Sequence, residues 1–506
     1  MRRTAALLLL SGAMLHGAPA QAETLREALA KAYRSNPTLT AARAGQRAVD
    51  ENVQIQRAAG LPGLDAQGQL TERLIIPGNQ LLAAQRQGFA QTQLSVPLFA
   101  GGAVRNGVRA AQTRVLAGRA QLRGTEADLF TNVVAAYMDV IRDEAVVGLN
   151  QQNVRALELN LRASRDRFQV GDLTRTDVAQ SESRLALARA QLQQAEARLI
   201  GSRETYVSLV GEPAGELQEP APLPGLPVTP DDAVRAAIDD NPQLQAAISN
   251  RQATRYDVSV ARANRLPRVN ATLGGNYSTF LGSVPQIAGG GFRIPNSAVA
   301  AEAGLNVTLP LFQGGRPAAQ VRQAQARESQ AIENVTATER NIIAQARSAY
   351  AIYRSSLEVI ASSEAAVGAA RLSLEGVRAE NSVGTRTILD ILNAEQELLN
   401  AQTNLVTARR DAFVASFNLL AAMGRAEAND LALDVGTPYD AAANYRRVKG
   451  RIFDWDSDPA PVPVATSTRG TPAQNATVTK PLDPILQQPV DRTRALTTGA
   501  ASPNRN

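Results

Sequence analysis

The chain has 506 residues, with 44% hydrophobic side chains, 4% aromatic side chains and no cysteine. Its one histidine, His16, lies in a segment interpreted below as a cleaved leader, so the mature chain carries neither Cys nor His. This composition excludes zinc, iron–sulfur or haem ligation by those residues and catalysis by a thiol or a Ser-His pair, and we expect no cofactor and no metal site. The net charge of +6 arises from Arg2, Arg3 and residues 446–506, so residues 23–445 are balanced and no nucleic-acid partner is expected.

Residues 1–22 carry the pattern of a signal peptide. Arg2 and Arg3 precede an apolar run, and Ala20-Gln21-Ala22 has the small–x–small form of a cleavage site. The mature protein would begin at Glu23, without the cysteine that a lipid-anchored protein needs at that point. No later stretch approaches about 18 apolar residues, so no transmembrane helix is expected.

An internal repeat organises residues 23–445. Four short sequence motifs, called marks below, recur in the same order. The first two recur at an offset of 205 residues and the last two at an offset of 213. The pairs are Asn36-Pro37-Thr38-Leu39 with Asn241-Pro242-Gln243-Leu244, Leu61-Pro62 with Leu266-Pro267, Val96–Gly102 with Leu309–Gly315, and Val170-Gly171 plus Asp177 with Val383-Gly384 plus Asp390. The change of offset predicts a surface loop of variable length between the second and third marks. We place the first repeat at residues 23–215, a proline-rich linker at 216–230 and the second repeat at 231–445.

The segments that flank each expected loop alternate between apolar and polar residues. They cover residues 64–71 and 90–96 in the first repeat and residues 269–273 and 301–309 in the second. This alternation predicts two β-hairpins, at about 64–98 and 268–311, with roughly ten residues per strand. One face is small and apolar and the other is polar and nearly uncharged, as in a transmembrane barrel strand. A soluble hairpin with one solvated face has the same pattern, and the strands alone do not separate the two.

The remainder of each repeat is predicted to be helical. No proline occurs between Pro97 and Pro213 or between Pro317 and Pro438, which predicts helices longer than those of a globular domain. A helix running from Ala103 to Gln169 would be roughly 100 Å long. Large and small residues form a heptad seam in each repeat: Val178, Leu185, Leu192, Leu199 and Tyr206 with Ser181, Ala188, Ala195 and Ser202, and Ile391, Leu398, Leu405, Ala412 and Leu419 with Ala394, Ala401, Ala408, Ala415 and Ala422. Such a seam favours close coiled-coil packing.

In these four repeated marks, taken together, the chain resembles the TolC family of outer-membrane efflux proteins over about residues 23–445. Four strands cannot close a barrel, so two copies would be needed for eight strands and three for twelve. The resemblance implies a fold of α plus transmembrane β: a homotrimer with one twelve-stranded outer-membrane β-barrel, four strands per chain, continued by a long α-helical coiled-coil barrel. It places the barrel in the outer membrane of a Gram-negative bacterium and the helices in the periplasm.

The function implied by the resemblance is passage across the envelope and not an enzymatic reaction. The chain would form the exit duct of a tripartite efflux or type I secretion system, in contact with outer-membrane lipid, a periplasmic adaptor protein and an inner-membrane transporter. The exported substrate stays open among drugs, proteins and polysaccharides. A soluble secreted coiled-coil or adhesin-like protein is the alternative. The acidic residues lie along helix surfaces and show no catalytic constellation, so an enzyme is not expected.

The turns at the ends of the coiled coils are the candidate site. Considered alone, Asp177 is a helix N-terminal acid favoured by the helix dipole, and Arg386 is a solvated loop charge. The resemblance implies instead a gated periplasmic entrance, in which Arg386 reaches Thr176 and Asp177 of the first tip. Asp390 would then match the first aspartate of a ring facing the lumen. The adaptor-docking tips would be formed by Val170, Gly171, Val383, Gly384 and Thr385.

Two further entrance positions depart from the family pattern. Asn381 stands where well-studied members have a tyrosine, and Asn393 stands where they have a second ring aspartate. Three copies would lack three carboxylates at the narrowest point. We therefore expect weaker cation selectivity and weaker block by divalent cations than in members with both aspartates.

Residues 446–506 differ in composition from the rest of the chain. The segment from residue 450 holds eight prolines among many Ser, Thr and Ala residues, without periodicity. Such a composition predicts a disordered C-terminal tail. Trp455, among Asp454, Asp456 and Asp458, is a candidate docking spot within it.

Overall fold

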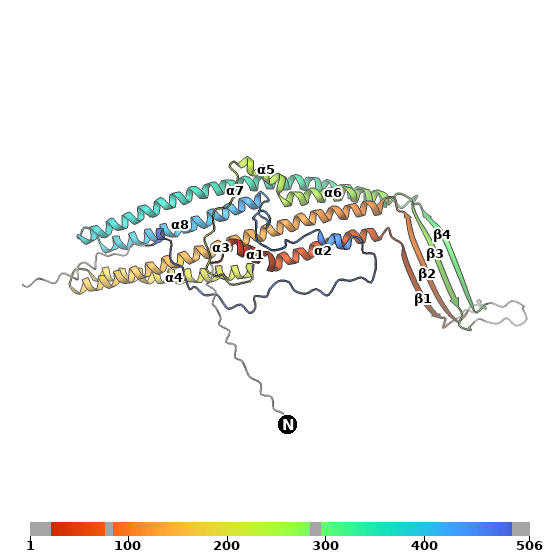
Figure 1. Cartoon of the computed structure of the whole chain (residues 1–506), viewed down its shortest axis with the longest axis horizontal. Helices are drawn as coiled ribbons and strands as arrows, with labels where there is room; N and C mark the ends of the chain where they lie inside the picture. The colour runs from red at the N-terminus through yellow and green to blue at the C-terminus, as the bar shows by residue number, and fades with distance from the viewer. Residues whose placement is uncertain (1–21, 76–83, 284–294, 488–506) are drawn as a thin grey trace, which may run out of the picture.

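The structure of the chain is a computed structural model that describes residues 22–75, 84–283 and 295–487. The expected signal peptide, apart from Ala22, and the last part of the tail lie outside these residues. Figure 1 shows an elongated molecule with a bundle of long helices at one end and a four-stranded sheet at the other. The helices of the first repeat are α1 (Leu25–Ser35), α2 (Pro37–Ala58), α3 (Ala103–Gln169) and α4 (Arg175–Val210). Those of the second are α5 (Pro230–Asp240), α6 (Pro242–Ala263), α7 (Arg316–Ser382) and α8 (Ile388–Ala422), and α9 (Ala443–Val448) follows.

The predicted tandem repeat is confirmed element by element. Both α2 and α6 have 22 residues, and both α3 and α7 have 67 residues, so the long helices predicted from the missing prolines are present. The Asn-Pro marks are helix N-termini, because the side chains of Asn36 and Asn241 each accept hydrogen bonds from two backbone N–H groups. The proline that follows has no N–H group, so it leaves no donor unpaired in the first turn. Each cap also ties two helices together: the amide of Asn36 donates to the carbonyl of Leu209, and that of Asn241 to the carbonyl of Ala422.

The two predicted hairpins join into one sheet. Its strands are β1 (Gly63–Glu72), β2 (Arg86–Phe99), β3 (Arg268–Thr279) and β4 (Ser297–Thr308), all antiparallel and in the order β1-β2-β3-β4. The register aligns Leu64, Leu94, Leu273 and Ala303 in one row, and Asp65, Gln93, Gly274 and Glu302 in the next. Because successive rows point to opposite faces, the apolar and polar residues separate as the alternation predicted. The pairing of β2 with β3 fuses the two halves at this end.

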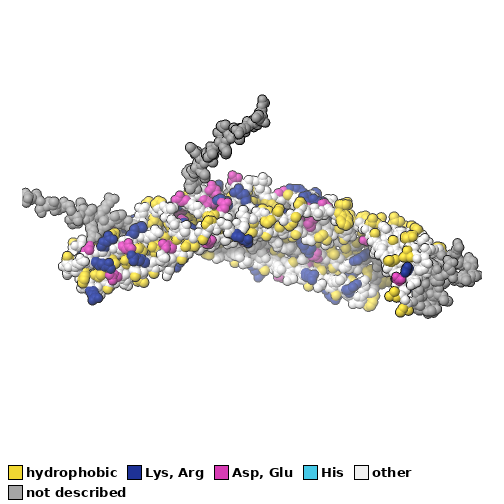
Figure 2. Space-filling view, turned by 90° about the horizontal axis from the view of Figure 1, so that it is seen from below, with side chains coloured by type: hydrophobic (Ala, Val, Ile, Leu, Met, Phe, Trp, Pro, Cys, Tyr) yellow, Lys and Arg dark blue, Asp and Glu magenta, His cyan; other side chains and the backbone are white. Residues whose placement is uncertain are grey.

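The two ends of the molecule also differ in the charge of their surfaces. Figure 2 shows hydrophobic side chains gathered over the strands, whereas Lys, Arg, Asp and Glu side chains gather over the helices. Among the described residues, no helix combines the length and the apolar character that crossing a membrane requires.

The heptad seams pack the helices in pairs, α3 against α4 and α7 against α8. Buried members of the second seam are Ile391, Leu398, Ala401, Leu405, Ala408, Ala412, Ala415 and Leu419, and those of the first are Ser181, Leu185, Ala188, Ala195, Leu199 and Tyr206. The alternation of large and small side chains lets the backbones approach, as expected for coiled-coil packing. The two coiled coils turn at the same end of the molecule, opposite the sheet (Figure 1).

The C-terminal segment contacts the helices near the end of its described part. Disorder of residues 446–506 stays a prediction, and most side chains between residues 451 and 481 are exposed. Leu486, in the short 3₁₀ turn Pro484–Leu486, is 4% exposed, and its carbonyl accepts a hydrogen bond from the side chain of Gln402 on α8 (2.9 Å). Asp483 pairs with Arg409 of α8 (3.0 Å). The segment cannot form a core of its own, but it docks into a groove that other helices provide.

Candidate functional site

The first tip connects α3 to α4 through a tight turn. Gly171 has φ +85°, a left-handed conformation that glycine adopts without strain. Its N–H donates to the carbonyl of Phe168 (3.1 Å), and the N–H of Asp172 donates to the carbonyl of Arg167 (2.9 Å). These bonds satisfy carbonyls that the end of α3 would otherwise leave open. Val170, beside the glycine, is 78% exposed at the very end of the coil.

The second tip repeats this geometry between α7 and α8. Gly384 also has φ +85° and donates to the carbonyl of Asn381 (3.0 Å), while the N–H of Thr385 donates to the carbonyl of Glu380 (3.1 Å). The hydroxyl of Thr385 donates to the same carbonyl (2.9 Å). Val383 is 74% exposed, in the place that Val170 has in the first tip.

Each tip starts its second helix with a capping box. The backbone N–H of Thr174 donates to Asp177 (2.9 Å) and the N–H of Asp177 donates to the hydroxyl of Thr174 (3.3 Å). Thr387 and Asp390 make the same pair of bonds (2.9 and 3.4 Å). The threonine hydroxyl and N–H lower the pKa of Asp177 and of Asp390, because both hydrogen bonds favour the charged carboxylate. Within one chain, both aspartates therefore act as helix N-terminal acids, the role that the residues alone suggested for Asp177.

Arg386 has a partner inside its own tip. Its Nε lies 2.7 Å from Oε2 of Glu380, and this exposed ion pair raises the pKa of Arg386. The side-chain amide of Asn381 donates to the carbonyl of Arg386 (2.7 Å), which fixes the backbone of the loop. Among the described contacts within one chain, none joins Arg386 to Thr176 or Asp177. The expected reach of Arg386 to the first tip therefore does not occur within a single chain.

The two coiled coils are connected above the tips by side chains on α8. Asn393 accepts a hydrogen bond from Arg184 of α4 (2.8 Å), so its side chain lies beside an arginine. Deeper in the structure, Glu395 is 1% exposed and accepts hydrogen bonds from Asn160 of α3 (2.9 Å) and Arg378 of α7 (3.0 Å). The Glu395 carboxylate thus connects three helices near the tips.

Sequence reasoning missed Glu395, although a signal was present. On α8 the buried stripe includes Ile388, Leu392, Leu399 and Val406 at helical spacing, and Glu395 falls on the same stripe. A charged residue on an apolar stripe needs a partner, because burial of an unpaired carboxylate is costly. The partners could not be named from the sequence, since they come from two other helices.

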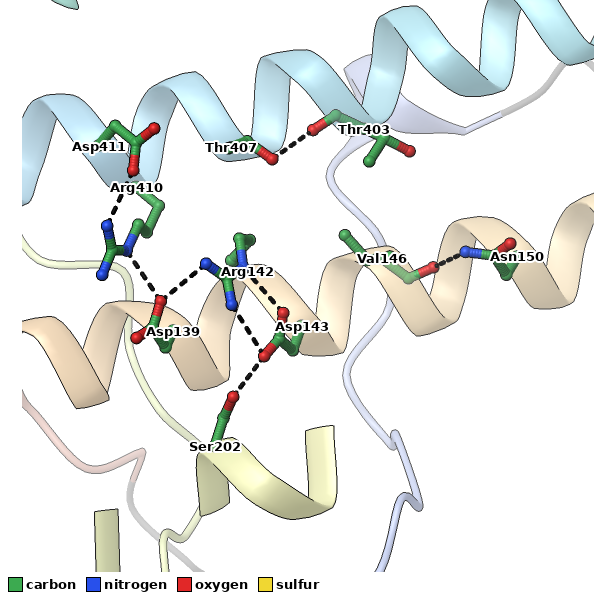
Figure 3. Close-up of polar contacts among 10 residues, drawn as sticks. All are labelled: Asp139, Arg142, Asp143, Val146, Asn150, Ser202, Thr403, Thr407, Arg410 and Asp411. Carbon is green, nitrogen blue, oxygen red and sulfur yellow. Dashed lines mark hydrogen bonds and ion pairs between the residues drawn. The ribbon is translucent and has the colours of Figure 1, made fainter. Parts of the chain in front are cut away.

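A second polar cluster lies farther from the tips, where α3, α4 and α8 meet (Figure 3). Asp139 of α3 bridges Arg142 (2.8 Å) and Arg410 of α8 (2.9 Å). Asp143, 4% exposed, pairs with Arg142 (2.8 Å) and accepts a hydrogen bond from Ser202 of α4. Carboxylates and guanidinium groups alternate along this cluster, so the buried Asp143 and its partly exposed neighbours neutralise one another. It joins the first coiled coil to α8 of the second.

Comparison with known proteins gives the same architecture. The chain is 35% identical over 451 residues to outer membrane efflux protein BepC of Brucella suis, covering 89% of this chain and 95% of that protein. It is 27% identical to outer membrane protein TolC of Escherichia coli over 364 residues, covering 68% of this chain and 72% of TolC. The crystal structure of the Campylobacter jejuni CmeC outer membrane channel superposes with a TM-score of 0.70 at 17% identity, covering 84% of this chain and 89% of that one.

The fold and these relatives define the class as an outer-membrane channel with strands in the membrane and a helical tunnel in the periplasm. Residues 28–212 and 233–425, one span in each repeat, match the family described as Outer membrane efflux protein. The chain belongs to this family of TolC-like channels, whose role is passage and not catalysis. Family membership also removes the alternative of a soluble secreted coiled-coil or adhesin-like protein.

Proposed function

We propose that three copies of the chain form one channel, with a twelve-stranded barrel and a helical tunnel, that serves as the exit duct of a tripartite efflux or type I secretion system. The sheet carries the proposal: within the described residues β1 pairs only with β2, and β4 only with β3. An open strand edge leaves N–H and C=O groups unpaired, which is not tolerated in lipid. Pairing β1 of one copy with β4 of the next removes both open edges. That the channel contains three copies rests on the resemblance to TolC.

The unequal burial of the two long helices supports assembly of several copies. Helix α3 buries residues along its whole length, whereas α7, its counterpart of equal length, buries only Val321, Ile342, Ala346, Val367 and Leu374. Large apolar side chains stay exposed on α7, namely Ile332, Ile352, Leu357, Val359 and Leu372. A neighbouring copy packed against α7 would cover them and gain the free energy of apolar burial.

The tips support a role in docking and gating. Val170 and Val383 present exposed apolar surface at the ends of the coiled coils, where an adaptor protein and, through it, an inner-membrane transporter would be engaged. The Arg386–Glu380 pair is exposed to solvent, and exposed ion pairs contribute little to stability. Arg386 can therefore exchange Glu380 for Thr176 or Asp177 of a neighbouring copy at little cost. In the proposed closed entrance, Arg386 makes that contact between copies.

Ion selectivity follows from the same residues. Asn393 lacks the carboxylate that a second ring, one turn above Asp390, would need, and the Arg184 side chain donates to Asn393 at 2.8 Å. We propose that the entrance is consequently less selective for cations, and less blocked by divalent cations, than one with aspartate at both positions.

The gate is tested by single-channel conductance of the purified protein in a planar bilayer. We expect a small conductance for the native protein and a several-fold larger one for Arg386→Ala, because the contact that closes the entrance is lost. Arg175→Ala removes the same charge from an exposed position of the first tip and serves as the matched control. A pore of native conductance in Arg386→Ala would leave the channel in place but overturn the gate assignment.

A further inference from the structure

The segment after α9 is held at the end of α2 that leads into the sheet. The side-chain amide of Gln54 donates to the carbonyls of Val448 (2.7 Å) and Arg451 (2.9 Å). Arg57, one turn farther along α2, donates to the carbonyl of Lys449 (2.7 Å). Three backbone carbonyls of the tail are thus fixed by two side chains of α2, so the following turn has a defined position.

The following segment, residues 449–458, forms a turn whose two ends are joined by pairs of arginine and aspartate. The N–H of Asp456 donates to the carbonyl of Phe453 (3.1 Å), which closes the turn. Asp458 pairs with Arg447 (2.6 Å) and Arg451 (3.0 Å), and Arg451 also pairs with Asp456 (3.2 Å). The Arg447 guanidinium, with help from Arg451, lowers the pKa of Asp458 to about 2. Two of the three acidic residues of the turn are therefore paired with arginine at its base.

The apex of the turn is apolar and exposed. Ile452, Phe453 and Trp455 are 72%, 71% and 87% exposed, and they lie within four consecutive residues. The indole of tryptophan combines a large apolar ring with one N–H donor, and such rings are enriched where lipid headgroups meet the hydrocarbon. Asp454, between the two aromatic residues, is charged and would have to remain in the headgroup layer. The composition of the apex therefore suits an interface and not the hydrocarbon core.

The position of the turn coincides with the expected edge of the membrane. A tilted strand needs about 9–11 residues to span a bilayer, and β1 has 10 residues, so little of this strand extends beyond the membrane. The membrane edge must therefore lie near the junction of strands and helices. Leu311 and Phe312, just past β4, are 89% and 90% exposed at this junction, as expected of an aromatic girdle. Figure 1 shows the tail turning back at the strand-side end of α2, beside the same junction.

We propose that the turn formed by residues 449–458 is a second membrane contact of the chain, which rests its Ile452, Phe453 and Trp455 side chains on the periplasmic leaflet of the outer membrane. The occupant is a phospholipid surface, because the turn lies beside the end of α2 that leads into the sheet and two of its three acidic residues are paired with arginine. Lys449, at the start of the turn, and Arg57 of α2, which donates to the Lys449 carbonyl, add positive charge that can approach lipid phosphates. The contact would tie the helical part of the channel to the membrane outside the barrel wall.

Trp455 provides its own probe, because it is the one tryptophan of the chain. The full-length protein is reconstituted into vesicles of phosphatidylethanolamine and phosphatidylglycerol, with or without bromine on the upper acyl carbons of the lipids. We expect blue-shifted tryptophan emission and a clear loss of its intensity in the brominated vesicles, as for an indole at the interface. Acrylamide, a quencher in the water phase, should have a weak effect.

The matched control moves the probe along the tail. The variant that combines Trp455→Phe with Val464→Trp places the indole at another exposed position, 72% exposed in the native chain, beyond the turn. Its emission should be insensitive to brominated lipid and strongly quenched by acrylamide. Emission from native Trp455 that behaves like this control would overturn the proposal. Equal bromine quenching at both positions would also overturn it, because it would show unspecific contact of the tail with lipid.

Discussion

Glu395→Ala is expected to loosen both coiled-coil tips. The Glu395 carboxylate is buried and accepts hydrogen bonds from Asn160 of α3 and Arg378 of α7. Removing one partner of a buried charged pair leaves the other charge uncompensated, which costs about 3–5 kcal/mol. If the tips open locally, this cost raises amide hydrogen exchange in the tip peptides by about 100-fold or more. Hydrogen exchange followed by mass spectrometry measures the effect peptide by peptide.

Glu397→Ala provides the control for this prediction. Glu397 lies two residues away on the same helix, but its side chain is exposed. Loss of an exposed glutamate typically changes stability by less than about 0.5 kcal/mol, so exchange at the tips should stay near that of the native protein. Equal exchange rates in the two variants would show that Glu395 does not hold the tips together. An effect confined to α8, with α3 and α7 unchanged, would contradict the three-helix role.

Leu486→Asp is expected to release the end of the tail from the helices. Leu486 is 4% exposed and belongs to a hydrophobic cluster with Leu149 of α3 and Leu398 of α8. Deleting a buried leucine costs about 2–5 kcal/mol, and a carboxylate in its place adds the cost of removing a charge from water. The bound state of the tail should become a minor one. Gln402 and Arg409 would lose their contacts with Leu486 and Asp483 at the same time.

Limited proteolysis of the tail measures this release. Cleavage by proteinase K, a protease of broad specificity, within residues 475–487 should accelerate by about 100-fold in Leu486→Asp if opening is fast relative to cleavage. In the docked state this segment is also held by Lys480, whose ammonium donates to the carbonyl of Leu217 (3.1 Å). Val464→Asp introduces the same charge at an exposed tail position and should leave cleavage unchanged. Native-like cleavage of Leu486→Asp would mean that the tail is not anchored at its end.

The long helices and the hairpins follow from local patterns, which is why the sequence predicted them well. Ala103 to Gln169 contains no proline, and the expected helix has these bounds in the structure. The strand alternation is equally local, since each residue faces one side or the other of a pleated sheet. The pairing of β2 with β3 was not predicted, because it joins segments separated by the whole α3–α6 region.

The interior contacts near the tips were harder to predict because they are made at long range. Glu395 and Gln402 interrupt the apolar stripe of α8 seven residues apart, and each has a partner on another segment. The contacts of the tail with the helices are also made at long range. A segment rich in proline cannot build a core, yet Leu486 and Asp483 need only a groove that other helices have already formed. The partner of Arg386 in a closed entrance would lie in another copy, and no single chain contains it.

The central claim is that several copies share one barrel through their sheet edges, and chemical cross-linking tests it most directly. The chain has no cysteine, so Ala66→Cys on β1 and Ala301→Cys on β4 would be the only thiols in the doubly substituted protein. A short bismaleimide applied to outer membranes containing this variant is predicted to yield covalent trimers. Each single variant should yield none, because one thiol per chain cannot link a ring. Only monomers from the folded, membrane-inserted double variant would contradict the shared barrel.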